Sequence, residues 1–445
     1  MLAVHRLAEP TALPVVAVLA VALGWTGCAQ PPPAPPLLLG TSAGETSAGE
    51  SSSGADDTDE APRTHAVDVL FVIDNGRAMG GPQARLAAAG APLLAGLDQL
   101  GLHWRIGFTT TDNGNPTCGS TSPEAGRLQL SSCRAHTGDF VFNGSPPTDA
   151  TASACTDLCP LDELVVQPTT TAQDDVPSQR LWLEPGNLPT GVTAAQAFAC
   201  AAPQGIAGCG FGSPLESGHK ALLRAALDDE AQHGFVRDDA LLVVVYVTDG
   251  VDCSYVNDFQ SIFLEEGAVA FWSDPAASAP TAAVCWNAGV GCSGGPGSYD
   301  ECHAENRDQD GNFGVSDERA VLHPVARYRD RLADLELEKQ GIDPAARVLV
   351  AVIGGLPPGY DHGTPLVYTD ASDSTVQLEL GIGPGCVQPD ASPVAPPVRL
   401  RELAESFAPH GASRNLWSVC DPSYDDAMAG ILAMIEAHVA PKDGP

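Results

Sequence analysis

The sequence predicts an α/β protein with a mainly parallel, Rossmann-like sheet and helices on both faces. Two apolar, largely β-branched runs, residues 67–73 and 241–248, suit strands that are buried on both sides, as in a parallel sheet. Each run is followed by an aspartate, Asp74 or Asp249, at its carboxyl end. Segments with apolar residues at helical spacing separate the runs, and this alternation of strand and helix is typical of a parallel sheet.

The composition narrows the classes of partner. The chain has 445 residues, with 22 Lys and Arg against 56 Asp and Glu, which gives a net charge of −34. Such a charge excludes neither cations nor proteins, but it disfavours nucleic acid and anionic membrane surfaces as direct partners. It suits the attraction of divalent cations, and an acidic, solvated surface is the simpler interpretation.

Residues 1–28 have the features of a secretion signal. A basic start precedes an apolar core, Val15–Trp25, which is too short to span a bilayer. The core ends in Thr26-Gly27-Cys28, which resembles a bacterial lipobox, although Trp25 stands where leucine is usual. We therefore expect Cys28 to carry lipid, as the only membrane contact of an exported protein. Its location would be the cell envelope, on the outer membrane or the cell surface; without the lipid it would be secreted.

The rest of the chain divides into a tether and one domain. Residues 29–62 are rich in proline, serine, glycine and acidic side chains, and they lack the apolar area needed to fold. We expect the domain to span residues 63–440. Two cysteine-rich stretches without clear periodicity, about 112–212 and 253–315, are predicted to be irregular insertions.

The elements of the domain follow from apolar periodicity and from cap and breaker residues. Proline at 92 and at 324 should kink its helix or delay the start of that helix. In chain order we expect strand 67–73, a helix through 86–100, strand 104–111, a short strand 127–131, a helix starting at Ser213-Pro214, strand 241–248, a helix opening at 316–318 and closed by Gly341, strands 347–353 and 416–419, and a last helix 425–439.

The cysteines indicate disulfide bonds. An even number remains once Cys28 is set aside, and no C-x-x-C pair points to a zinc site. The pairing cannot be deduced from the sequence. The candidates are Cys118, Cys133, Cys155, Cys159, Cys200, Cys209, Cys253, Cys285, Cys292, Cys302, Cys386 and Cys420.

Two motifs resemble those of the von Willebrand factor A (VWA) domain. They are F-V-I-D-N-G-R-A-M at 71–79 and Y-V-T-D-G at 246–250. The resemblance covers the elements between Val67 and His438, without the two insertions, and the whole chain is similar to uncharacterised secreted bacterial lipoproteins of this type. It implies a domain that binds a protein partner and is generally not a catalyst. Many such domains hold a divalent cation at a metal-ion-dependent adhesion site (MIDAS).

The resemblance also implies a set of metal ligands. The MIDAS pattern is Asp-x-Ser-x-Ser with a later threonine and aspartate, and Asp74 and Asp249 match its two aspartates. Gly76 and Ala78 replace the two serines and supply no side-chain oxygen, while the threonine position falls near Ser213. We expect a degenerate site at which Mg²⁺ or Ca²⁺ binds weakly or not at all. The alternative is a structural turn in which Asp74 caps the following helix.

A second acidic stretch is a candidate calcium loop. Asp308, Asp310 and Asn312 alternate along the chain, as oxygen ligands do in calcium loops. An EF-hand would require glycine and glutamate where Phe313 and Arg319 stand. An acidic loop turn is the alternative.

No catalytic residues are assigned. The stretch Gly291–Gly295 fits G-x-S-x-G, but proline and glycine follow it where a nucleophile elbow requires a helix. Three functions stay open. The first is an adhesion-type protein-binding module on the envelope, whose protein ligand is unknown. The others are a structural envelope component with a vestigial site and a secreted hydrolase.

Overall fold

The computed structural model describes residues 65–119, 121–361, 363–408 and 414–439, all within the unit Glu60–Pro445. The predicted signal peptide, Cys28 and the tether lie outside these residues, so the predictions about them stay untested. No helix in the described part of the chain is both long and apolar enough to cross a membrane.

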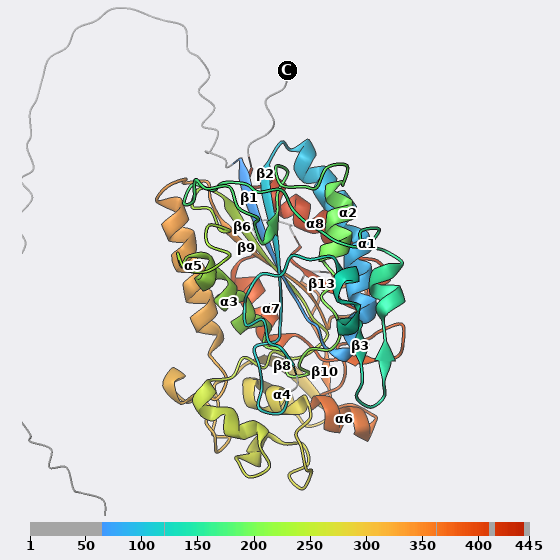
Figure 1. Ribbon diagram of the computed structural model, residues 1–445. Coiled ribbons are helices and arrows are strands. Elements are labelled where there is room, and N and C mark those ends of the chain that lie inside the picture. The colour runs from blue at the N-terminus through green and yellow to red at the C-terminus, as the bar shows by residue number, and fades with distance from the viewer. Residues whose placement is uncertain (1–64, 120, 362, 409–413, 440–445) are drawn as a thin grey trace, which may run out of the picture. The chain divides into compact units, whose positions relative to one another are not determined.

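A mainly parallel sheet forms the centre of the domain, as the sequence predicts (Figure 1). Within the described residues this sheet has six strands, and only the edge strand β5 runs antiparallel to its neighbour. The order is β13 (Leu416–Ser418), β9 (Val348–Gly354), β6 (Leu241–Val247), β1 (Ala66–Ile73), β2 (His103–Thr110) and β5 (Trp182–Leu183).

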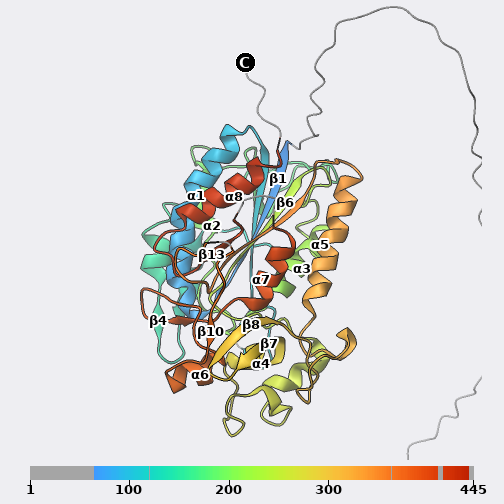
Figure 2. The same cartoon turned by 180° about the vertical axis from the view of Figure 1, so that it is seen from behind.

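Helices cover both faces of this sheet (Figures 1 and 2). The side chains of β1 alternate between two cores: Phe71 packs into one and Leu70 into the other. The first core holds residues of α1 (Gly80–Gln99), α2 (Ala194–Ala201) and α8 (Asp425–Glu436). The second core holds residues of α3 (Pro214–Ala225), α5 (Val325–Gln340) and α7 (Val398–Ser406).

Two glycines let helices approach α1 closely. A Cβ atom on Gly90 would lie 2.2 Å from the ring of Phe198 in α2. A Cβ atom on Gly96 would lie 2.1 Å from Leu432 in α8. Glycine lowers the intrinsic stability of a helix. It is favoured at these two positions because Phe198 and Leu432 fill the space that a larger side chain would need.

The insertions are more regular than the sequence predicts. The first supplies α2 and β5, so it completes both a helical layer and the edge of the sheet. The second builds its own small core with the loops that follow β9. The remaining helices and strands are β3 (Val141–Phe142), β4 (Thr148–Asp149), α4 (Ala283–Gly289), β7 (Val290–Gly295), β8 (Ser298–Ala304), β10 (Tyr368–Thr369), α6 (Ser374–Leu380), β11 (Cys386–Val387) and β12 (Pro393–Val394).

The disulfide prediction is confirmed. All twelve candidate cysteines pair within the described residues, and the pairs at 118–209, 133–155, 159–200, 253–285 and 292–302 lie inside the two insertions. The sixth, Cys386–Cys420, joins β11 to the end of β13. Disulfides of this number are typical of proteins that leave the reducing cytosol.

Three element predictions need correction. Residues 127–131 are not a strand: a single backbone bond, from Gln129 N–H to Phe108 O at 2.8 Å, reaches β2. The helix does not open at 316–318, where only a 3-10 turn forms, but begins at Val325; the delay is one of the two outcomes expected from Pro324. In contrast, α1 is a continuous helix that already begins at Gly80 and includes Pro92.

We expect the substitution Gly90→Ala to destabilise the domain by about 1–3 kcal/mol, because the new methyl group would overlap the Phe198 ring. Gly81→Ala is the matched control, since Gly81 lies on the exposed side of the same helix and alanine raises helix propensity there. Denaturant unfolding with intact disulfides measures both. Equal stability of the two variants would contradict the packing argument.

Candidate functional site

The register of three parallel strands creates a polar row at the carboxyl edge of the sheet. Ile73, the last residue of β1, is in register with Thr110 of β2 and Val247 of β6. The next residues along the three strands are therefore Asp74, Thr111 and Thr248. The carboxyl edge is where open α/β sheets usually bind ligands.

The Asp74 carboxylate is buried and receives its hydrogen bonds from the protein. The backbone N–H of Gly76 donates to Asp74 Oδ1 at 2.8 Å, and the Thr248 hydroxyl donates to Oδ2 at 2.5 Å. Gln83 Nε2 donates to the Asp74 carbonyl at 2.8 Å and to the Gly205 carbonyl at 2.7 Å. The bond from Gly76 fits the structural-turn alternative. The expected helix cap is not formed, because neither the 3-10 helix Arg77–Met79 nor α1 has a side-chain hydrogen bond at its N-cap.

Asp249 follows Thr248 and is held from a distant part of the chain. Gln388 Nε2 donates to Asp249 Oδ2 at 3.0 Å and to the carbonyl of Ala78 at 3.3 Å. Gln388 directly follows β11, which Cys386–Cys420 fixes to the end of β13. The loops after β1, β6 and β11 therefore meet at one place.

The two carboxylates repel each other. Burial, followed by repulsion from Asp74, raises the pKa of Asp249 to about 8. Burial also raises the pKa of Asp74, although the hydrogen bonds from Thr248 and Gly76 oppose that rise. Asp249 therefore holds a proton near neutral pH, which relieves the repulsion.

The oxygens at this edge do not form a complete cation site. The buried Thr111 hydroxyl lies beside Asp74, but Gly76 and Ala78 contribute no side-chain oxygen, and Gln388 places an amide donor on Asp249. No group of three or more His, Cys, Asp or Glu side chains in the described part of the chain is arranged to hold a metal ion. Weak or absent cation binding stays our prediction.

Ser213 lies near this edge but points elsewhere. It precedes α3, and its backbone N–H donates to Thr111 O at 2.8 Å, which places it beside the row. Its hydroxyl donates to the carbonyl of Cys253 at 2.8 Å, so the oxygen is engaged by the backbone of the second insertion.

No protein-family model matches this chain, and no curated protein matches it.

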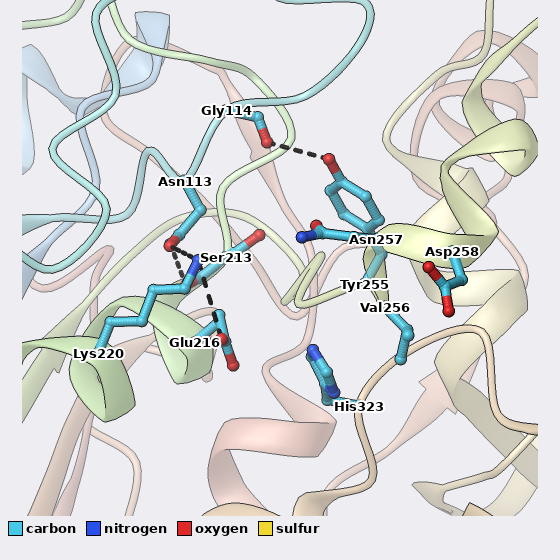
Figure 3. Close-up of a pocket in the computed structure, with 10 residues that line it drawn as sticks. All are labelled: Asn113, Gly114, Ser213, Glu216, Lys220, Tyr255, Val256, Asn257, Asp258 and His323. Atoms are coloured by element: carbon cyan, nitrogen blue, oxygen red, sulfur yellow. Dashed lines mark hydrogen bonds and ion pairs between the residues drawn. The ribbon is translucent and has the colours of Figure 1, made fainter. Parts of the chain in front are cut away.

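A polar cavity of about 230 Å³ opens beside Ser213 (Figure 3). Lys220 Nζ donates to Asn113 Oδ1 at 2.9 Å and lies 3.8 Å from Glu216 Oε1. Burial lowers the pKa of Lys220. Burial opposes ionisation of Glu216, but the hydrogen bond and charge of Arg327 outweigh it, so the pKa of Glu216 is lowered. Glu216 is therefore an ionised member of an ion pair.

The rest of this cavity carries aromatic and histidine side chains (Figure 3). The Tyr255 hydroxyl donates to the Gly114 carbonyl at 3.3 Å. His323 lies just before α5, and burial lowers the pKa of its imidazole. His219 on α3 lies outside the lining and is half-buried, which lowers its pKa to about 4. Both imidazoles pack edge-on against Tyr328, as expected of packing residues.

The candidate calcium loop is closed by its own contacts. Asp308 Oδ1 accepts hydrogen bonds from the backbone of Asp310 at 3.2 Å and of Asn312 at 3.0 Å. Asp308 Oδ2 forms an ion pair with Arg319. A guanidinium therefore occupies the position where a cation would bind, which favours the acidic-turn alternative.

Sequence reasoning missed three residues of the site. Thr111 and Thr248 could have been found by aligning the ends of the three predicted strands, because they then fall beside Asp74. Gln388 gave no comparable signal, because its segment has no periodicity and reaches the site only through the folding of a distant hairpin.

We predict that replacing Asp249 with Asn makes stability less dependent on pH. The ordinary pKa of an aspartate is about 4, whereas that of folded Asp249 is about 8. Between these values the folded state binds more protons, so the free energy of unfolding falls as pH rises. The stability of Asp249→Asn relative to wild type should therefore increase over this range, by on the order of a few kcal/mol.

Denaturant unfolding in EDTA at a series of pH values measures this difference. Asp330→Asn is the control, because it removes an equal charge from an exposed position on α5 and should leave the profile of the wild type unchanged. A constant difference between Asp249→Asn and wild type would contradict the coupling.

Proposed function

We propose that this chain is an exported, VWA-like protein-binding module with a degenerate MIDAS. The observation that carries the proposal is the convergence of Asp74, Thr248 and Asp249 at the carboxyl edge of a parallel sheet. Sequence motifs that resemble VWA loops supply these three residues. Ligands of open α/β sheets bind at this edge, and the Asp-x-Ser-x-Ser oxygens needed for a strong cation site are missing.

The loops around the edge are fixed in a way that suits recognition of a protein surface. Two glutamines, Gln83 and Gln388, tie the loops after β1, β6 and β11 and the chain before α3 to one another. Preorganised loops lose little conformational entropy on binding. The proposal thus explains why the edge is built from protein hydrogen bonds in place of metal ligands.

We expect the full chain to capture a protein from an envelope extract of its host, and capture to persist in EDTA. Val387, a 51% exposed neighbour of Gln388, is the residue to change. Val387→Arg should reduce capture at least about tenfold, because a long charged side chain would obstruct the edge. The matched control is Val176→Arg, since Val176 is a comparably exposed valine in a loop outside this edge.

The captured protein is quantified by mass spectrometry against both variants. Capture that is equal for Val387→Arg and Val176→Arg would refute binding at this edge. Loss of capture in EDTA would refute the metal-independent form of the proposal.

We also predict that calorimetry detects weak Mg²⁺ and Ca²⁺ binding or none. The double substitution Gly76→Ser, Ala78→Ser should raise affinity by restoring two hydroxyl ligands. Gly76 has extended backbone angles, φ −69° and ψ 162°, that serine adopts readily. Its new Cβ would lie 3.2 Å from Asp74 Oδ1, so the loop must shift slightly.

Adding Asp74→Ala to the serine variant should abolish the gain and serves as the control. Tight binding to the wild type that Asp74→Ala removes would show that the site is a working MIDAS after all.

A further inference from the structure

A second pocket, of about 170 Å³, opens beside Asn75, and three acidic side chains contribute to its polar lining. Its carboxylates are Asp112, Glu124 and Asp139, and Asn75 adds a carboxamide. No Lys, Arg or His of the described residues lines it. The pocket therefore concentrates negative charge without a cation of its own, in a protein that carries a net charge of −34.

Folding holds the three carboxylates in place by separate means. Asp112 is buried and accepts from the backbone N–H groups of Gly114 at 2.8 Å and Cys209 at 3.1 Å. Glu124 accepts from the Thr110 hydroxyl. Burial raises the pKa of Glu124, and the charges of Asp112 and Asp139, which line the same pocket, raise it further.

Asp139 is the exposed member of the set. Its side chain is 63% exposed, and its Oδ2 lies 3.0 Å from the imidazole of His136. Its backbone carbonyl accepts from Ile206 at 2.7 Å and Ala207 at 3.0 Å, so the backbone is held independently of the carboxylate. The side chain is therefore free to meet a ligand at the mouth of the pocket.

Asn75 supplies an independent sign that a ligand belongs here. It lines the pocket, only 6% of the residue is exposed, and its Oδ1 has no hydrogen-bond partner. The carboxamide lies flat on Gly208, where a Cβ atom would come within 2.2 Å of it. Buried polar atoms are rarely left unpaired, and such an atom often marks a missing ligand.

The spacing of the carboxylates does not favour a bare metal ion as the occupant. No three acidic, histidine or cysteine side chains in the described part of the chain are close enough to share one metal, whereas Ca²⁺ needs oxygens at about 2.3–2.6 Å. The volume of about 170 Å³ also far exceeds the roughly 10–15 Å³ that one water molecule requires. A flat cation with several spread donors matches such spacing better, and a guanidinium has five N–H donors.

We propose that this pocket binds the guanidinium group of an arginine side chain on a partner protein. The inference rests on the proposed binding function and specifies the chemistry of the partner. Asp139 and Glu124 would accept its N–H donors, with Asn75 as a neutral acceptor after its carboxamide rotates. The acidic surface would speed encounter with such a basic partner.

Binding of the tripeptide Ala-Arg-Ala, with blocked termini, tests the pocket without the partner. Calorimetry on the full chain should detect it at low salt, whereas the same peptide with citrulline in place of arginine should bind at least about tenfold more weakly. Citrulline keeps the shape and removes the charge, so equal binding of the two peptides would overturn the proposal. EDTA should change neither result.

Two conservative variants locate the binding. Asp139→Asn and Glu124→Gln should each weaken the arginine peptide about tenfold, since each removes one charged acceptor. The control Asp330→Asn removes an equal charge from α5 and should have no effect beyond a small salt-dependent change. Thermal unfolding checks that all three variants are folded. Similar weakening by Asp330→Asn would mean that only net charge attracts the peptide, which overturns the site.

Spermidine serves as the competing probe, because it is a flexible cation with ammonium groups in place of a guanidinium. Spermidine that binds as tightly as the peptide and is lost in the same variants would overturn the assignment to an arginine side chain. Failure of the peptide to bind refutes this inference alone, because the envelope-capture experiment tests partner binding separately.

Discussion

The burial of one carboxylate organises the functional edge of this protein. Asp74 is 5% exposed at the end of the central strand β1, and a buried charge is costly unless the surrounding protein pairs it. The register of β6 places the Thr248 hydroxyl where it donates to Asp74, and the turn at Gly76 supplies a backbone N–H. The neighbouring loops then pack around a carboxylate that is already hydrogen-bonded. Asp249 lies close enough for the charge of Asp74 to raise its pKa.

The insertions belong to the site and are more than additions to the fold. The first disulfide, Cys118–Cys209, closes the first insertion across the carboxyl edge, and the N–H of Cys209 fixes Asp112. The same insertion carries Glu124 and Asp139. Covalent closure reduces the entropy that these long loops would lose on adopting one arrangement. The disulfides thus allow irregular chain to hold charged groups close together.

The sheet and its aspartates could be predicted because they depend on local patterns. An apolar run such as 67–73 predicts a buried parallel strand, and the end of the run places Asp74 at the carboxyl end of that strand. Helix α7 and the role of Gln388 could not be predicted, because both depend on segments folded by distant contacts, including Cys386–Cys420. Residues 127–131 show the opposite error: they have strand-like composition, but only one backbone bond joins them to the sheet.

Under the proposals above, the absence of hydroxyls at positions 76 and 78 changes the kind of partner that this edge attracts. A metal-loaded adhesion site is positively charged and recruits a carboxylate from its partner. Here Gly76 and Ala78 supply no side-chain oxygen, and the acidic side chains Asp74, Asp112, Glu124 and Asp139 gather around the edge. Asp249 adds a further negative charge only above a pH of about 8. An edge with unbalanced carboxylates gains most from a ligand that brings a cation of its own. The edge that binds a partner's carboxylate in a metal-loaded adhesion site would therefore bind a positively charged group here.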